Sequence, residues 1–163
     1  MLNSSNIFYN KKILIYGLGK SGLSVFKYLK KDNEITTHDD KKKIDYKKII
    51  KVKFDYIIIS PGIDINKCNL SKFLKSNSKK IYTDLDIFYS RNKENNKITI
   101  TGTNGKSTTA KILYDTLKDQ KVDARLVGNI GNPVLLEKKV TNKTVFVIEA
   151  SSYQLEYSKL FKS

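Results

Sequence analysis

The 163-residue sequence has a single cysteine, a single histidine and no tryptophan. Because Cys68 has no second cysteine to pair with, an internal disulfide and a cluster of thiolate ligands are both excluded, which favours a reducing cytoplasm. His38 is equally alone, outside any HExxH or Cys/His spacing. We therefore interpret His38 as an ordinary polar residue at a strand end rather than as a metal ligand.

Long apolar runs are missing as well. No stretch approaches the ~18 uncharged apolar residues that a membrane span needs. Residues 1–12 lack the apolar region of a signal peptide. We therefore expect a cytoplasmic protein with no membrane partner, and we take it to be a monomer.

Arginine is scarce, although the formal net charge is +15. Only Arg91 and Arg125 are arginines, and the other basic residues are lysines spread along the chain. Proteins that read nucleic-acid grooves favour arginine, whose guanidinium makes bidentate contacts. Lysine runs such as residues 41–43 are more typical of solvated surfaces. The charge therefore does not lead us to expect a nucleic-acid partner.

What the sequence does contain is an alternation of short apolar runs with helix-length segments. The runs that predict strands are residues 12–17, 34–39, 54–60, 79–83, 97–101, 122–128 and 143–150. The segments that predict helices are 21–31, 106–119, 151–161 and a short stretch after Pro133. Uncharged runs are typical of parallel strands buried on both faces, so the alternation favours a doubly wound α/β fold.

The polar segment 90–97 has no apolar anchor and predicts a linker between two compact units. We expect a Rossmann-like parallel-sheet domain over residues 1–92 and the first part of a P-loop-type α/β domain over residues 93–163. The three strands of the second unit are fewer than the roughly four to six of common sheets. We therefore expect an incomplete second domain that has an unpaired sheet edge and folds poorly alone.

The turn 102–108, GTNGKST, joins a predicted strand to a predicted helix. Glycines let backbone N–H groups approach phosphate oxygens, and the following helix places its positive end there. Lys106 would reach the β- and γ-phosphates, and the Ser107 hydroxyl would ligate Mg²⁺. Ile100 stands where the strict GxxxxGK[ST] pattern has its first glycine, so the turn is a shorter one. Its strand-to-helix setting predicts a nucleotide triphosphate.

A second glycine-rich turn, GLGKSG at 17–22, also follows a predicted strand and opens a predicted helix. Asp39 lies at the end of the next strand, where its carboxylate can accept hydrogen bonds from a ribose or a base. This setting favours a dinucleotide or a nucleotide diphosphate over a merely structural turn. The spacing does not say which nucleotide. Ser60–Gly62 ends another strand at the same edge and is equally compatible with a simple turn.

Polar residues also close the last two predicted strands. Asn129 follows the strand 122–128, and Glu149 ends the apolar run before Ser151. A carboxylate at the end of a buried strand beside a phosphate turn is a typical Mg²⁺ ligand, since Mg²⁺ prefers carboxylates together with phosphate oxygens and water. The alternative is that this segment only caps a helix, through Ser151 or Ser152.

Five motifs occur together in this order: GLGKSG at 17–22, SPGI at 60–63, GTNGKST at 102–108, GNIGNP at 128–133 and EASSYQLE at 149–156. Together they closely resemble the motifs of the Mur ligase family, over essentially the whole chain. Sister branches typically carry GTHGKTT or GTNGKTT, and folylpolyglutamate synthases carry GTNGKGS. GTNGKST with an N-terminal GLGKSG resembles the branch that adds D-glutamate.

The resemblance implies that the first unit holds the UDP moiety of a substrate rather than NAD. The substrate-binding positions that it implies are Leu18, Lys20 and Ser21 along the diphosphate, Asp39 and Asp40 near the uridine, Gly62 at the nucleotide, and Asn129 and Ser151 toward the muramoyl group. Asp40 and Lys41 stand where many members have Thr and Arg.

For the second unit, the resemblance implies ATP as the nucleotide. The implied ATP-binding residues are Gly102, Thr103, Asn104, Gly105, Lys106, Ser107 and Thr108. Ser107 and Glu149 would hold one Mg²⁺, and Lys106 and Glu149 would be the catalytic residues.

The implied reaction belongs to peptidoglycan synthesis. In the family, ATP phosphorylates the terminal carboxylate of UDP-N-acetylmuramoyl-L-alanine, and the amine of D-glutamate displaces phosphate from the acyl phosphate. A histidine, a carbamylated lysine and a C-terminal domain that binds D-glutamate lie farther along the family's chain than this sequence reaches. We therefore expect residues 1–163 alone not to complete the ligation.

Two interpretations of other classes stay open. A nicotinamide-dependent protein would use the turn 17–22 and Asp39 for NAD, which leaves the turn 102–108 unexplained. A non-catalytic nucleotide-binding module would use both turns without chemistry.

Overall fold

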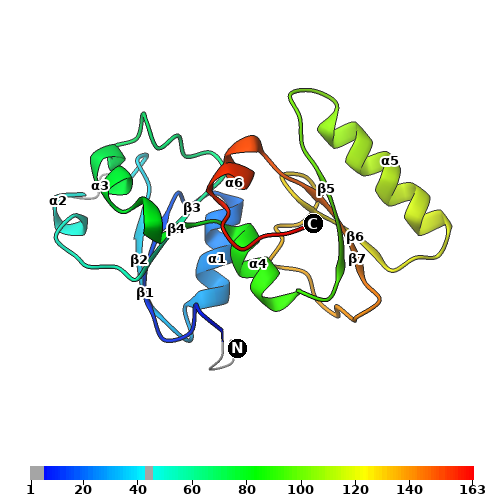
Figure 1. Cartoon of the computed structure of the whole chain (residues 1–163), viewed down its shortest axis with the longest axis horizontal. Helices are drawn as coiled ribbons and strands as arrows, with labels where there is room; N and C mark the ends of the chain where they lie inside the picture. The colour runs from blue at the N-terminus through cyan, green and yellow to red at the C-terminus, as the bar shows by residue number, and fades with distance from the viewer. Residues whose placement is uncertain (1–5, 43–45) are drawn as a thin grey trace.

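The computed structural model describes residues 6–42 and 46–163. Those ranges leave out residues 1–5 of the N-terminal segment 1–12 and Lys43 of the lysine run 41–43. The described chain folds into two parallel sheets with helices beside and between them (Figure 1). None of the helices in these ranges has the length and apolar character needed to cross a bilayer.

The first sheet has the strand order β2-β1-β3-β4, with all neighbours parallel. Its strands are β1 (Lys12–Tyr16), β2 (Glu34–His38), β3 (Tyr56–Ile59) and β4 (Ile81–Tyr82). The helical segments of this half are α1 (Lys20–Leu29), α2 (Tyr46–Ile49), α3 (Ser71–Ser76), a 3₁₀ turn η1 (Ser78–Lys80) and α4 (Asp84–Arg91). The central strands β1 and β3 are buried along nearly their whole length, as their apolar composition predicts.

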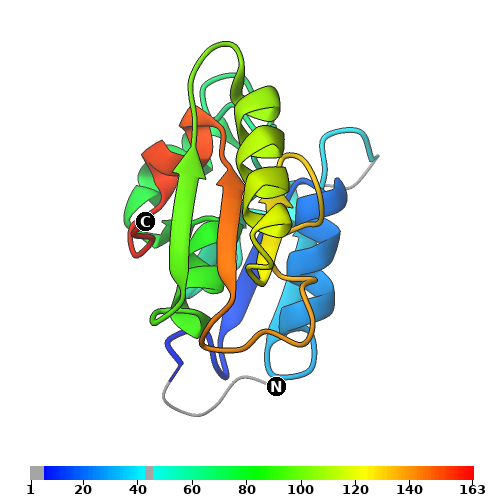
Figure 2. The ribbon, with the colours of Figure 1, turned by 90° about the vertical axis from the view of Figure 1, so that its right-hand side faces the viewer.

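The second sheet has the order β5-β7-β6 and is also parallel. Its strands are β5 (Asn96–Ile100), β6 (Ala124–Gly128) and β7 (Val145–Glu149), and its helices are α5 (Lys106–Asp119) and α6 (Ser152–Tyr157). Figure 2 shows α5 lying along one face of this sheet. Since every pairing is parallel, the carboxyl ends of β5, β6 and β7 share one edge.

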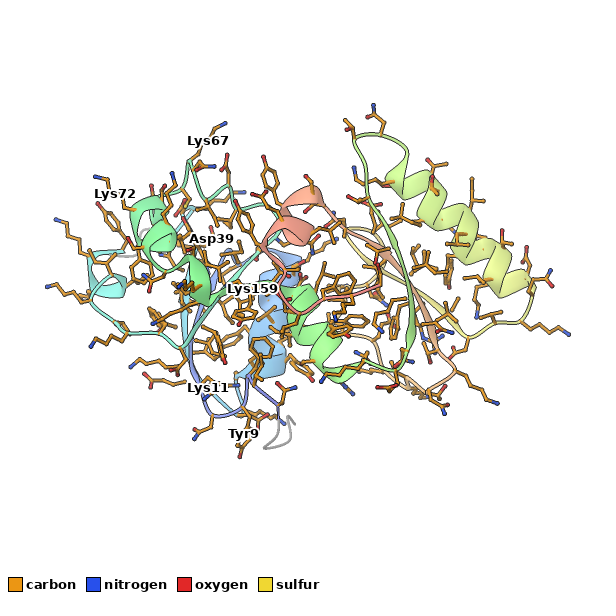
Figure 3. The ribbon with its side chains drawn as sticks, in the orientation of Figure 1. Tyr9, Lys11, Asp39, Lys67, Lys72 and Lys159 are labelled. Atoms are coloured by element: carbon orange, nitrogen blue, oxygen red, sulfur yellow. The ribbon has the colours of Figure 1, made fainter. Side chains whose placement is uncertain are left out.

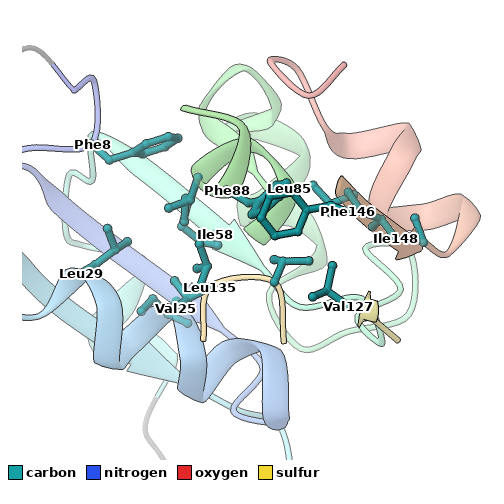
Figure 4. Close-up of a cluster of buried hydrophobic side chains, with 14 of the residues drawn as sticks. Phe8, Val25, Leu29, Ile58, Leu85, Phe88, Val127, Leu135, Phe146 and Ile148 are labelled. Carbon is teal, nitrogen blue, oxygen red and sulfur yellow. The ribbon is translucent and has the colours of Figure 1, made fainter. Parts of the chain in front are cut away.

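The two sheets share one hydrophobic core, with α1 and α4 between them (Figures 1 and 4). Phe88 of α4 meets Phe146 of β7 edge to face, with 4.8 Å between the ring centroids. Val25 of α1 and Ile15 of β1 belong to the same buried cluster as Ile148 of β7. A second cluster, on the other face of the first sheet, includes Leu14, Ile57, Ile59 and Leu74.

The seven predicted strands are all present. Six are one to three residues shorter than predicted, and β5 has the predicted length but begins one residue earlier. The helix 106–119 is confirmed at both ends. The predicted helix 151–161 ends early, at Tyr157, because the chain then extends and the backbone N–H groups of residues 159–161 bind the Asp86 carboxylate.

The prediction of a short helix after Pro133 is wrong. Residues 134–135 form a single turn, closed by the bond from the Leu136 N–H to the Pro133 carbonyl oxygen. Val134 and Leu135 are both buried in the shared core, so the need to bury these two adjacent side chains overrides the helical signal of the proline.

The polar segment predicted to be a linker is short and well anchored. Asn92 is buried, and its side-chain amide donates to the Phe88 carbonyl oxygen at the end of α4. Asn95 donates to the carbonyl oxygens of Thr141 and Thr144, and β5 begins at the next residue. Polar side chains here make the hydrogen bonds that fix the passage from one sheet to the other.

Candidate nucleotide and substrate site

A cavity of about 640 Å³ lies at the carboxyl edge of the first sheet and is closed on one side by the loop after β6. Of the eight predicted substrate-binding residues, seven line it: Leu18, Lys20, Ser21, Asp39, Asp40, Gly62 and Asn129. The eighth, Ser151, is not among the lining residues. The structure therefore brings residues from three strand ends of the first sheet together with one from the second. The turn 102–108 lies outside this cavity.

The turn 17–22 is shaped by close backbone packing. Gly17 has a φ of +90°, and a Cβ atom on Gly22 would overlap with the Gly17 carbonyl oxygen. The Ser60 hydroxyl donates to that same oxygen at 2.7 Å. Only glycine fits at residue 22, because α1 must begin directly against the preceding turn.

Asp39 fastens this turn to the end of β2. One carboxylate oxygen accepts the Leu18 N–H at 2.7 Å, and the other accepts the Lys41 N–H at 3.0 Å. These bonds hold the pKa of Asp39 below its ordinary value, because they favour the charged form. Figure 3 places the Asp39 side chain in the half of the molecule built on the first sheet. The cavity therefore has one fixed negative charge beside the glycine turn.

Asp40 is held from three sides. The Tyr16 hydroxyl donates to one carboxylate oxygen at 2.6 Å, His38 Nε2 lies 3.2 Å from the same oxygen, and the Asn69 N–H donates to the other. Burial raises the pKa of Tyr16, and the bond to Asp40 raises it further, so the phenol stays a neutral donor. His38 therefore positions a carboxylate here. Within residues 6–42 and 46–163, His, Cys, Asp and Glu form no group of three suited to a metal ion.

The turn 102–108 lies between the end of β5 and the start of α5, as predicted. Gly102 and Gly105 have φ values of +140° and +78°, which only glycine adopts readily. In the described chain the N–H groups of residues 103–105 make no hydrogen bond to protein. Lys106 folds back, and its Nζ donates to the Gly102 carbonyl oxygen at 2.6 Å. The turn thus has free backbone donors and one cation at a helix N-terminus, the chemistry that phosphate requires.

Glu149 is buried at the carboxyl end of β7, and its Oε2 has no hydrogen-bond partner in the described chain. Its register partner on β5 is Ile100, so the turn 102–108 leaves the sheet beside it. On the other side, the Asn129 N–H donates to the Glu149 carbonyl oxygen at 2.9 Å. An unpartnered buried carboxylate oxygen is the kind of ligand that Mg²⁺ prefers.

Sequence reasoning missed the polar residues that connect the two halves. Asp84 and Asp86 of α4 and Gln154 of α6 are all buried, although aspartate and glutamine usually lie on the surface. The local signals were two helix-capping patterns, TDLD at 83–86 and SSYQ at 151–154. Figure 3 shows Lys67 and Lys72 pointing away from the molecule, whereas Lys159 lies over the Tyr82 ring, with its Nζ 4.9 Å from the ring centroid.

Residues 100–162 match the family model described as "Mur ligase middle domain". A UDP-N-acetylmuramoylalanine--D-glutamate ligase of Rickettsia bellii (strain RML369-C) is 34% identical over 169 residues, which cover 95% of this chain and 37% of that protein. The ligase of the same name from Francisella philomiragia is 37% identical over 158 residues, 91% of this chain and 37% of that protein. The chain belongs to the Mur ligase family. Both relatives carry the name of one member, known as MurD.

The chain spans a little over a third of the length of these relatives, 37% in both cases. Among solved structures, the UDP-N-acetylmuramate:L-alanyl-gamma-D-glutamyl-meso-diaminopimelate ligase of Neisseria meningitides is 13% identical, with a TM-score of 0.48, over 88% of this chain and 55% of that one.

Proposed function

We propose that the chain forms the part of a MurD-type ligase that binds the UDP substrate and the phosphates of ATP. The whole enzyme would join D-glutamate to UDP-N-acetylmuramoyl-L-alanine in peptidoglycan synthesis. The observation that carries the proposal is the pair of glycine turns, 17–22 and 102–108, each between a parallel strand and the start of a helix. Residues 1–92 would be the UDP-substrate domain and residues 93–163 the first part of the ATP domain.

The cavity supports the substrate half of this proposal. The diphosphate would lie against the turn 17–22, where Lys20 offers a positive charge and the first N–H groups of α1 offer donors. Asp39 would accept hydrogen bonds from the nucleoside, and Asn129 would reach the muramoyl group from the second sheet. A volume of about 640 Å³ falls in the range of sites for small-molecule ligands.

The turn 102–108 supports the ATP half. Lys106 would leave the Gly102 carbonyl oxygen and bind the β- and γ-phosphates, offsetting the negative charge that develops when the γ-phosphoryl group moves to the substrate carboxylate. Ser107 and Glu149 would hold one Mg²⁺, which, when bound, further neutralises the transferring oxygens. The part of this chain in the reaction is therefore alignment and charge neutralisation, and D-glutamate binding would belong to the remainder of the enzyme.

Binding by the chain itself tests the substrate assignment. We expect residues 1–163 to bind UDP-N-acetylmuramoyl-L-alanine, and NADH not to compete, in an isothermal titration. Lys20→Ala should weaken the affinity about tenfold, because it removes a charged contact to phosphate. Lys27→Ala is the matched control, since Lys27 is exposed at the far end of the same helix. Tighter binding of NADH than of the UDP compound would instead support the nicotinamide alternative.

A further inference from the structure

The loop 129–137 forms the wall of the substrate cavity that comes from the second sheet. Its residues Asn129, Gly131 and Pro133 line the cavity of about 640 Å³. Gly131 also lines a second cavity, of about 300 Å³, together with Asn132 and Glu137 of the same loop. Because this part of the loop borders two cavities, its position depends on the contacts that it makes with β6.

The backbone of the loop is fastened to β6, which is an edge strand of the second sheet. The Asn132 N–H donates to the Leu126 carbonyl oxygen at 3.3 Å, and the Asn132 carbonyl oxygen accepts the Gly128 N–H at 3.0 Å. A Cβ atom on Gly131 would lie 2.1 Å from the Leu126 carbonyl oxygen, so the loop approaches the strand as closely as glycine allows. Both hydrogen bonds involve Asn132, which makes this residue the point of attachment.

Glu137 holds the side chain of Asn132. Its Oε1 accepts a hydrogen bond from Asn132 Nδ2 at 2.7 Å, and its Oε2 lies 3.3 Å from Nε of Arg125 on β6. The side chains of Glu137 and Arg125 are 10% and 25% exposed, so this ion pair is better shielded from water than a typical surface pair. One carboxylate thus ties the loop to the strand from which the loop departs.

Arg125 is held from its other side by Asp123. The two side chains form a second ion pair, and Asp123 Oδ2 accepts the Thr144 hydroxyl at 2.6 Å. That hydrogen bond holds the pKa of Asp123 below its ordinary value, because it favours the charged form. Arg125 therefore has two acidic partners, of which Glu137 holds the loop 129–137 and Asp123 faces the residue before β7.

We propose that Glu137 is a positioning residue for the wall of the cavity that faces the muramoyl group. By tying Asn132 to Arg125, it keeps Asn129 and Gly131 in place at the edge of the second sheet. This inference rests on the proposed function, in which Asn129 reaches the muramoyl group while the diphosphate lies against the turn 17–22. Glu137 is not among the residues that line the substrate cavity, so it acts through the loop rather than by contact with the substrate.

The test compares two ligands, because UDP has no muramoyl group for the loop to contact. Isothermal titration of the chain with UDP and with UDP-N-acetylmuramoyl-L-alanine measures both affinities, and the muramoyl compound should bind more tightly. Glu137→Gln keeps the size of the side chain but removes its charge. It should weaken the affinity for the muramoyl compound about fivefold and leave that for UDP within about twofold.

Asp123→Asn is the matched control. It removes the charge of the other acidic partner of Arg125 and leaves the bond between Glu137 and Asn132 intact. Both affinities should therefore stay within about twofold of those of the unsubstituted chain. Arg125→Met cuts the connection of Glu137 to β6 from the strand side, and it should reproduce the result if Glu137→Gln does not fold.

The outcomes separate this inference from the function beneath it. If the muramoyl compound binds no more tightly than UDP, or if Glu137→Gln weakens both ligands equally or neither, the positioning role is overturned and the nucleotide site stands. A loss in Asp123→Asn equal to that in Glu137→Gln overturns it as well, since the cause would then be general stability. If neither ligand binds the unsubstituted chain, the proposed function fails together with this inference.

Discussion

Gly22 packs so closely against Gly17 that a Cβ atom on Gly22 would overlap with the Gly17 carbonyl oxygen and approach the Ser60 hydroxyl to 2.8 Å. This contact brings the start of α1 against the end of β1. The N–H groups at the start of the helix are thereby aimed into the cavity where a diphosphate would lie.

Gly22→Ala should therefore destabilise the fold by at least ~2 kcal/mol, since the helix must shift to make room for the methyl group. Urea denaturation followed by circular dichroism measures this change. Gly19→Ala is the control: a Cβ there meets no heavy atom within 4 Å, and φ is −68°, so its free energy of unfolding should stay within ~0.5 kcal/mol. Equal losses in the two variants would contradict the packing argument.

Lys106→Ala should remove ATP binding, both in this chain and in the full-length enzyme. The free N–H groups of residues 103–105 remain in the variant, but the one cation of the turn is lost. Titration with ATP and Mg²⁺ measures the affinity. Lys111→Ala, on the exposed side of the same helix, should bind as the unsubstituted chain does. An unchanged affinity in Lys106→Ala would refute the assignment of the turn.

Asp39→Asn should change the pH dependence of stability. The pKa of Asp39 is lowered in the folded chain by hydrogen bonds from the Leu18 and Lys41 N–H groups. A lowered pKa means that the carboxylate stabilises the fold fully above its ordinary value of 3.8, and that this contribution is lost as the pH falls through the folded value.

The variant should thus be about 1 kcal/mol less stable than the unsubstituted chain at pH 7, and the gap should shrink as the pH falls below 3.8. Urea titrations at several pH values measure both. Asp115→Asn breaks only an exposed ion pair with Lys111, so it should cost about 0.5 kcal/mol or less at neutral pH. A gap for Asp39→Asn that stays constant with pH would show that the carboxylate charge is not the cause.

Phe146→Ala should cost about 3 to 5 kcal/mol of stability. Phe146 is fully buried, and its ring meets Phe88 edge to face, so truncation leaves a cavity between β7 and α4. The control is Ile112→Ala, because Ile112 is 61% exposed on α5. A cost for Phe146→Ala as small as that for Ile112→Ala would mean that the interface between the sheets is not packed as described.

Much of this fold could be predicted because the strands are apolar runs whose neighbours are glycines, asparagines and charged residues. The helix 106–119 was predicted at both ends because Gly105 precedes its first turn and the pattern stops at Asp119. The turn after Pro133 could not be predicted correctly, since Val134 and Leu135 are buried in a cluster with Phe88 of α4 and Phe146 of β7, which are other elements of the fold.

Part of the candidate site could likewise be predicted from the sequence, and part could not. Local motifs indicated the two glycine turns, and the parallel topology explains why Asp39, Gly62 and Asn129 meet at one cavity. The contacts of Asp84 with Gln154 and of Asp40 with Tyr16 could not be foreseen, because nothing local marks an aspartate whose partner lies on another element. Such long-range polar pairs require the tertiary structure.

The hydrophobic core that α1 and α4 share with β7 affects how cooperatively the chain unfolds. The side chains that the two sheets bury against each other lose their cover once either sheet is lost, since Phe88 and Phe146 each cover the other. Melting should accordingly be cooperative, with a single calorimetric peak whose enthalpy agrees with the van't Hoff value.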